Sequence, residues 1–428
     1  MKKIRQYFII FICIFAININ VFAQSDIYDK LSEIAEIAKI EKLESTEFQE
    51  KYLTFFTQKI DPKNDSVGTF RQRVVVFHAG FDRPTLIVTE GYGGSYALRP
   101  KYREEISRLF NTNMIFVEHR YFLESTPETK DWKYLTAENS AEDLHAIVTT
   151  FKKIYPQKWI SAGISKGGQT ALIYRTFFPD DVNISVPYVA PLCYGVEDGR
   201  HEPFLRNVST AENRKKIEDF QIELLKRREK LMPEFEKLCA EKNFEFNIPL
   251  AEIYDYCVLE YSFAFWQWGS DVAQIPASDA SDEDIFKHFI AINSPSYFVK
   301  ESNKPFFVQA ARELGYYGYD IEPFKPYLVI KSSKEYLKKI FLSPSDSIDF
   351  DETLNKKIIN FLETNDPKMM FIYGEIDPWS AAGVTWLKDK QNIKVFIQPN
   401  GSHRTRISTM PETMKSEAIE TLTKWLEE

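Results

Sequence analysis

The chain has 428 residues, of which 44% are hydrophobic and 27% are charged, the balance of an ordinary globular protein rather than a disordered or fibrous one. This length exceeds the usual single domain, so we expect either two domains or one large domain with an insertion. The formal net charge is −8 and no basic stripe interrupts it, which excludes nucleic acid as an expected partner.

The first 23 residues (1–23) predict a signal peptide. Lys2, Lys3 and Arg5 precede an apolar run, and small residues end that run just before Gln24, the expected mature N-terminus. The run is interrupted before it reaches the roughly 20 residues that span a bilayer, so a retained anchor is the weaker alternative. No later segment is apolar enough to cross a membrane. We therefore expect an exported protein, periplasmic or secreted, that leaves the membrane once the leader is removed.

The first half of the chain reads as strands with a helix between them. After Ser140, which can cap a helix, apolar positions recur at helical spacing. Short apolar runs of the kind found in strands buried on both faces flank this helix. The expected strands are Arg73–His78, Thr85–Thr89, Asn113–Glu118, Trp159–Ala162 and Ile184–Pro191.

Helical periodicity then replaces the strand pattern, beginning with the charged stretch Ser209–Lys242. Strands return at Lys368–Tyr373 and Ile393–Gln398, and an amphipathic helix, Ser416–Leu426, closes the chain. Alternating strands and helices on both sides of a helical block predict an α/β protein whose mostly parallel sheet is interrupted by an inserted cap. We expect residues 24–194 and 361–428 to form the core and residues 195–360 to form the helical cap.

The strongest motif is Gly-x-Ser-x-Gly around Ser165, which follows a short apolar strand and precedes a helix. This is the nucleophile elbow of the α/β-hydrolase fold, in which two glycines make room for a strained turn that exposes the serine hydroxyl. The motif therefore predicts an α/β-hydrolase with Ser165 as nucleophile.

In this fold the acid and then the histidine follow the serine along the chain. His403 lies in a loop after the last predicted strand, whereas His201 and His288 lie at or within the helical block, so we expect His403 to be the base. Glu375 and Asp377 both follow the preceding strand, and the turn Asp-Pro-Trp favours Asp377 as the acid that orients the imidazole.

The oxyanion of an acyl-transfer intermediate needs backbone N–H donors. One donor is expected from Lys166, the residue after the nucleophile. The other is expected from the glycine-rich loop Thr89–Ser95, where Tyr92 and Gly93 are the candidates.

With these motifs in place the chain resembles the secreted tripeptidyl aminopeptidase family of bacterial serine peptidases, relatives of the lysosomal Pro-X carboxypeptidase and dipeptidyl peptidase group. The resemblance spans about residues 70 to 405. It is carried by the elbow, the Asp-Pro-Trp and Gly-Ser-His motifs, Glu118–Phe122, Tyr134–Thr136 and Phe265–Gly269. Lysosomal relatives carry tyrosine after the nucleophile, whereas Lys166 matches the bacterial branch. The resemblance implies release of tripeptides from free N-termini, often after proline, beneath a helical cap.

An aminopeptidase of this kind must hold the substrate's α-ammonium at a fixed distance from the serine, and a buried ammonium needs a carboxylate. Glu260 is the first candidate because it is the one acid in an aromatic, apolar stretch of the cap. Glu118 and Glu90, near strand ends, are the alternatives, and Trp266 is expected in the cap wall that contacts substrate.

Several alternatives stay open at this point. An esterase or lipase would use the same triad on another acyl substrate, and a non-catalytic binding protein would usually lack a triad residue. Cys193, Cys239 and Cys257 have no metal-ligand spacing, so we expect no metal and no other cofactor. One disulfide, between Cys239 and Cys257, competes with three buried free thiols.

Overall fold

The computed structural model describes residues 26–301, 303–343, 346 and 348–428. The expected signal peptide and its cleavage site lie outside these residues. Among the helices described, none is long and apolar enough to cross a membrane.

One nine-stranded sheet organises the fold, in the order β1-β2-β3-β5-β4-β6-β7-β8-β9. The first three strands pair antiparallel, β3 is antiparallel to β5, and the strands from β5 to β9 are parallel to one another. The strands are β1 (Ile37–Lys42), β2 (Glu50–Lys59), β3 (Thr69–His78), β4 (Thr85–Thr89), β5 (Asn113–Val117), β6 (Trp159–Ile164), β7 (Ile184–Tyr188), β8 (Met369–Gly374) and β9 (Ile393–Gln398).

Every strand expected from the sequence is present, within a few residues of its expected ends. The strands β1 and β2 were not expected, because their polar and apolar residues do not follow a simple alternation and β1 is half exposed at the edge of the sheet. All ten residues of β2 pair with the ten residues of β3, and β1 in turn pairs with β2.

Helices cover both faces of the sheet. One core cluster joins a sheet face to α1, α3, α4 and α12, and another joins the opposite face to α2 and α13. These helices are α1 (Asp26–Ser32), α2 (Glu105–Phe110), α3 (Ala137–Phe151), α4 (Lys166–Phe177), α12 (Thr353–Thr364) and α13 (Glu412–Glu427). Helix α3 begins earlier than expected, because the Thr136 side chain rather than Ser140 caps it and accepts from the Asn139 N–H.

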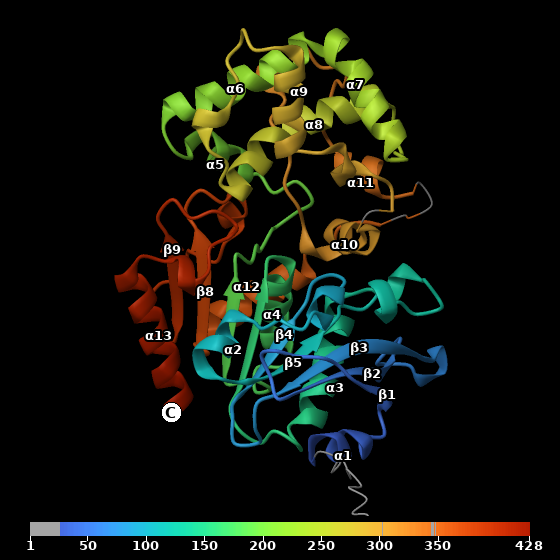
Figure 1. The fold of residues 1–428 in the computed structure, drawn as a ribbon, viewed down its shortest axis with the longest axis vertical. Helices are drawn as coiled ribbons and strands as arrows, with labels where there is room; N and C mark the ends of the chain where they lie inside the picture. Colours follow the sequence, from blue (N-terminus) through green and yellow to red (C-terminus); the bar gives the residue numbers. More distant parts are fainter. Residues whose placement is uncertain (1–25, 302, 344–345, 347) are drawn as a thin grey trace, which may run out of the picture.

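The chain between β7 and α12 builds a separate helical layer over one edge of the sheet, which Figure 1 shows above β8 and β9. Its helices are α5 (His201–Asn207), α6 (Ala211–Lys226), α7 (Arg228–Glu241), α8 (Leu250–Trp268), α9 (Asp282–Ile292), α10 (Lys304–Gln309) and α11 (Tyr336–Phe341). They share an apolar cluster of their own, which also includes Tyr121 and Trp379 from loops of the core.

The expected end of this cap at residue 360 falls inside α12. Leu354, Ile358 and Leu362 of that helix pack in the cluster of the sheet and α4, so α12 lies with the core. Of the two alternatives for the cysteines, the structure has the free thiols: Cys193, Cys239 and Cys257 are all buried and unbridged.

Candidate active site

Three predicted residues follow three parallel strands at the same edge of the sheet. Ser165 follows β6, Asp377 follows β8 and His403 lies in the loop after β9. The carboxyl ends of parallel strands meet at one edge, which is where ligands bind in open α/β sheets. The helical cap lies over that same edge (Figure 1).

Ser165 has the strained backbone of a nucleophile elbow. Its φ is 58° and its ψ is −123°, a conformation that a residue with a side chain rarely adopts, and its N–H donates to the Tyr188 carbonyl at 2.8 Å. The elbow packs so closely that a Cβ at Gly163 would lie 2.2 Å from the Gly167 carbonyl oxygen. The glycines on both sides of Ser165 are therefore required by contact with neighbouring backbone.

His403 and Asp377 form a buried pair. The imidazole Nδ1 lies 2.7 Å from Asp377 Oδ2, and the other carboxylate oxygen accepts the Trp379 N–H at 3.1 Å. Asp377 has no exposed surface. Glu375 is instead exposed and accepts the Asn400 backbone N–H at 2.8 Å, so it is bonded away from the imidazole. Of the two acids that the sequence left in competition, Asp377 is the one in contact with His403.

A small cavity of about 20 Å³ lies beside Ser165. That is room for about one water molecule beside the partly exposed serine. Core and cap both contribute to the lining, which consists of Tyr92, Ser165, Lys166, Gln169, Pro191, Phe306, Gly315, Tyr316 and Trp379.

Sequence reasoning missed the cap's contribution to this wall. Phe306 and Tyr316 come from segments far along the chain, and no motif marks them. The only available signal was the aromatic excess of the middle region. Trp379 is the last residue of the Asp-Pro-Trp turn, which in the sequence indicates only the acid Asp377.

Lys166 ties the expected oxyanion loop to the elbow. Its buried ammonium donates to the Gly91 carbonyl at 2.7 Å. Burial lowers the pKa of Lys166 to about 7, against the opposing influence of Glu90 and Glu313. The Tyr92 N–H, a candidate oxyanion donor, is 3.1 Å from a Glu90 carboxylate oxygen in this structure, so an oxyanion would have to share that donor.

The third oxyanion candidate, Gly93, packs against Leu123: a Cβ there would lie 2.6 Å from the leucine Cδ1. Beside it, Gly94 donates its N–H to Glu118 Oε2 at 2.8 Å. The loop is thus held from several sides by the chain around it.

The carboxylate of Glu118 is fully used within the protein. Oε2 accepts from Arg73 at 2.7 Å and from the Gly94 N–H, while Oε1 accepts from the hydroxyl and the N–H of Ser125 at 2.9 and 3.2 Å. A carboxylate has about four acceptor sites, and all four are occupied. In this structure these hydrogen bonds hold the loop, and a role of Glu118 in binding substrate stays a prediction.

Glu260 lies in α8, buried beneath two tyrosines of the cap. The hydroxyls of Tyr317 and Tyr319 donate to its Oε2 at 2.9 and 2.8 Å. Burial raises the pKa of Glu260 to about 8, because desolvation outweighs the two hydrogen bonds. Tyr317 in turn stacks on Tyr316, at 4.4 Å between ring centroids, and Tyr316 lines the cavity of Ser165. Two stacked tyrosine rings, those of Tyr317 and Tyr316, thus lie between Glu260 and that cavity.

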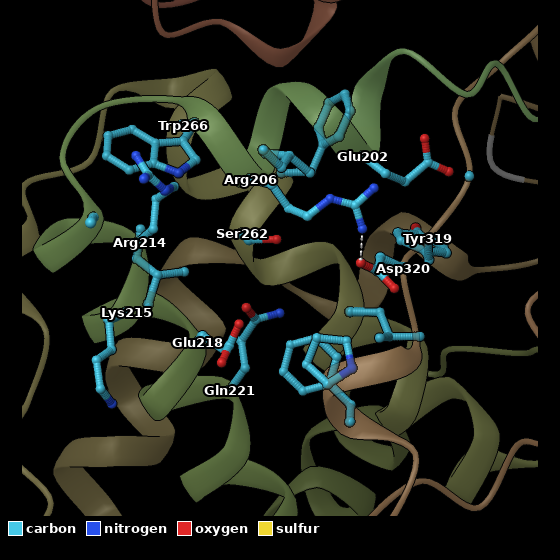
Figure 2. Close-up of a pocket in the computed structure, with 18 residues that line it drawn as sticks. Glu202, Arg206, Arg214, Lys215, Glu218, Gln221, Ser262, Trp266, Tyr319 and Asp320 are labelled. Carbon is cyan, nitrogen blue, oxygen red and sulfur yellow. Dashed lines mark hydrogen bonds and ion pairs between the residues drawn. The ribbon is translucent and has the colours of Figure 1, made fainter.

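Trp266, also in α8, lines a different cavity of about 380 Å³ inside the cap. Figure 2 shows it beside Arg214, across from Tyr319 and the ion pair that Arg206 forms with Asp320. Tyr319 lines this cavity and also donates to Glu260. No residue that lines this cavity also lines the cavity beside Ser165. Within the described part of the chain, no group of three or more His, Cys, Asp or Glu side chains is arranged to hold a metal ion.

The chain is similar to known proteins over most of its length. The profile of the PS-10 peptidase S37 family matches residues 22–427. The chain is 28% identical over 418 residues to the prolyl tri/tetrapeptidyl aminopeptidase of Streptomyces mobaraensis, covering 94% of this chain and 85% of that one. Among solved structures it is similar to a proline iminopeptidase from Mycobacterium smegmatis, at 11% identity and a TM-score of 0.43 over 87% of this chain and 98% of that one. An acetyl xylan esterase from Paenibacillus sp. R4 is similar at 9% identity and a TM-score of 0.40, over 94% and 91%.

Proposed function

The chain belongs to the PS-10 peptidase S37 family, and from that membership and the geometry of the site we propose that it is an exported serine exopeptidase that releases short peptides from free N-termini. The observation that carries the proposal is the buried His403–Asp377 pair at the same sheet edge as the strained Ser165. We assign these three residues as the catalytic triad.

In the proposed mechanism Ser165 attacks the scissile carbonyl while His403 takes its hydroxyl proton. Asp377 holds the imidazole in the tautomer with a proton on Nδ1 and stabilises the imidazolium. The Lys166 N–H and the loop N–H of Tyr92 receive the oxyanion. His403 then gives its proton to the leaving amine, and water releases the short peptide from the acyl-enzyme by the same steps in reverse.

The cavity of Ser165 supports a compact residue on the acyl side of the scissile bond. Four of its nine lining residues are aromatic, namely Tyr92, Phe306, Tyr316 and Trp379, and aromatic faces pack well against a small apolar ring. The Streptomyces relative is named for prolyl substrates. We therefore propose cleavage after proline, whose compact ring would pack against these aromatic side chains once the cap segment has moved away.

We propose Glu260 as the site of the substrate ammonium. Three extended residues span roughly 10 Å, and Glu260 is connected to the Ser165 cavity through Tyr317 and Tyr316. Tyr317 and Tyr319 both donate to Oε2, which leaves Oε1 without a donor among the described residues. A substrate ammonium at Oε1 would pair with the buried charge and favour its ionised form.

The test compares three reporters: a tripeptide anilide that ends in proline and has a free N-terminus, the same compound N-acetylated, and p-nitrophenyl acetate. We expect the free-amine peptide to be used at least about 100-fold better than the acetylated one, because acetylation removes the charge that Glu260 pairs with. Glu260→Gln should weaken use of the free-amine peptide by about 2–5 kcal/mol and leave the ester almost unchanged. Efficient cleavage of the acetylated peptide would overturn the exopeptidase assignment, and equal losses on peptide and ester would give Glu260 a packing role instead.

A further inference from the structure

The last turn of helix α8 lies against the loop that carries His403. The His403 backbone N–H donates to the Gln267 carbonyl at 2.9 Å, and the Trp268 ring stands perpendicular to the imidazole with centroids 6.0 Å apart. The Arg404 guanidinium covers the same indole ring at 5.6 Å. The end of helix α8 therefore contacts His403 and its neighbour Arg404. Ser402, the other neighbour of His403, lies against the next residue along the chain from Trp268.

That next residue is Gly269, which ends α8 in the left-handed conformation with φ at 67°. A Cβ at Gly269 would lie 3.0 Å from the Cβ of Ser402. A side chain there would be strained by its backbone angle and would press on the histidine loop. The fit between helix end and loop is thus close at three consecutive cap residues.

These contacts bear on the base in two ways. The last four carbonyls of a helix have no partner within it, and the His403 N–H satisfies that of Gln267, which ties the loop to the helix. The carboxyl end of a helix also carries partial negative charge, which favours the positive charge that develops on the imidazole during acyl transfer.

The pair with Asp377 holds the imidazole at Nδ1 only. A ring held at one atom can still turn about that contact, and the opposite nitrogen is the one that must face the serine. We propose that Trp268 is a positioning residue for His403, packing against the ring and limiting its rotation so that the other ring nitrogen faces Ser165 during the reaction. This inference rests on the proposed role of His403 as the base.

The test uses Trp268→Leu, which keeps apolar volume but removes the ring, and Trp268→Phe, which keeps an aromatic ring. The side chain is 46% exposed, so its loss should not unfold the cap. Two readouts are needed: kcat and KM for p-nitrophenyl acetate, and the rate at which a fluorophosphonate labels Ser165. Tyr327→Leu, another exposed aromatic of the cap, serves as the matched control.

We expect Trp268→Leu to lower kcat and the labelling rate by about 10- to 100-fold, with KM for the ester unchanged, because the base is misplaced and not the substrate. Trp268→Phe and the Tyr327 control should stay within about threefold of the wild type. Gly269→Ala should lower the labelling rate as Trp268→Leu does, and it carries the test if the leucine variant fails to fold. Labelling of Trp268→Leu at the wild-type rate, or a phenylalanine variant as impaired as the leucine one, would overturn the proposal.

The ester separates this inference from the proposed function. A wild-type protein that hydrolyses the ester but no free-amine peptide would refute the exopeptidase assignment and leave the Trp268 test intact. Ester hydrolysis that survives Ser165→Ala and His403→Ala would refute the triad, and with it the role of Trp268.

Discussion

At the scale of single residues, this site depends on carboxylates whose surroundings differ. Asp377 is buried against an imidazole, whereas Glu375, two positions earlier, is exposed and bonded to backbone. Glu260 is buried with two tyrosine hydroxyls and no cation among the described residues. The same chemical group thus binds an imidazole, a backbone N–H or two tyrosine hydroxyls, according to the groups around it.

The triad assignment predicts that the losses of activity in single variants do not add in a double variant. Ser165→Ala and His403→Ala should each lower turnover by roughly 10⁴- to 10⁶-fold, and the double variant should be little worse, because triad residues act as a unit. Asp377→Asn should cost about 10⁴-fold by favouring the wrong tautomer. Steady-state kinetics on the ester measures all of these. Glu375→Gln is the control, and a larger loss there than in Asp377→Asn would refute the choice of acid.

Glu260 predicts a pH-dependent stability. Its pKa is about 8 in the folded protein, and a free glutamate titrates near about 4.3. The folded protein therefore keeps a proton that the unfolded chain releases, so this group's contribution is full below about pH 4.3 and is lost as the pH rises through about 8. From about pH 5 to 9, the free energy of unfolding of the wild type should fall by on the order of 2–5 kcal/mol relative to Glu260→Gln. Urea unfolding at each pH measures this, and parallel curves for the two proteins would contradict it.

At the scale of elements, the loop after β4 is held by groups from three directions. The Lys166 ammonium binds the Gly91 carbonyl, the Glu118 carboxylate binds the Gly94 N–H, and the Glu90 carboxylate binds the Tyr92 N–H. Donors aimed at an oxyanion act best when they need not rearrange during the reaction. The charged residues that the sequence placed near these strand ends serve this loop.

Glu118→Gln should therefore weaken the fold and the reaction together. Arg73 would keep only its exposed partner Glu124, at 3.5 Å, so we expect a loss of about 3 kcal/mol in the free energy of unfolding. Turnover should fall equally on peptide and ester, because the loop serves the chemical step. Glu124→Gln is the matched control and should change stability by less than about 1 kcal/mol. A loss confined to free-amine peptides would instead restore Glu118 as a binding residue.

At the scale of the whole molecule, the cap leaves little room beside the serine. The cavity of about 20 Å³ is too small for a peptide, and Phe306, Gly315 and Tyr316 of the cap form part of its wall. Peptide binding therefore requires this segment to move away from the sheet edge. The cap shares its apolar cluster with Tyr121 and Trp379 of the core, and these contacts would change in that movement.

The signal peptide expected from the sequence predicts where the mature protein is found. Cleavage after Ala23 would give a mature chain beginning at Gln24, outside the cytoplasm. N-terminal sequencing of periplasmic and secreted material from the expressing cell tests this. Recovery of an intact Met1 in the membrane fraction would support an anchor.

The nucleophile elbow, the order of the triad residues and the parallel strands could be read from the sequence, because each is a local pattern with a local physical cause: glycines at a strained turn, short apolar runs, a loop histidine after the last strand. The strands β1 and β2, the tyrosines above Glu260 and the wall of the serine cavity could not. Their partners lie far away along the chain, as Tyr316 does from Ser165, and no local pattern records them. The hydrogen bonds of Glu118 could not be read from the sequence either, since their four donors come from three segments and the sequence shows only a carboxylate at the end of a strand.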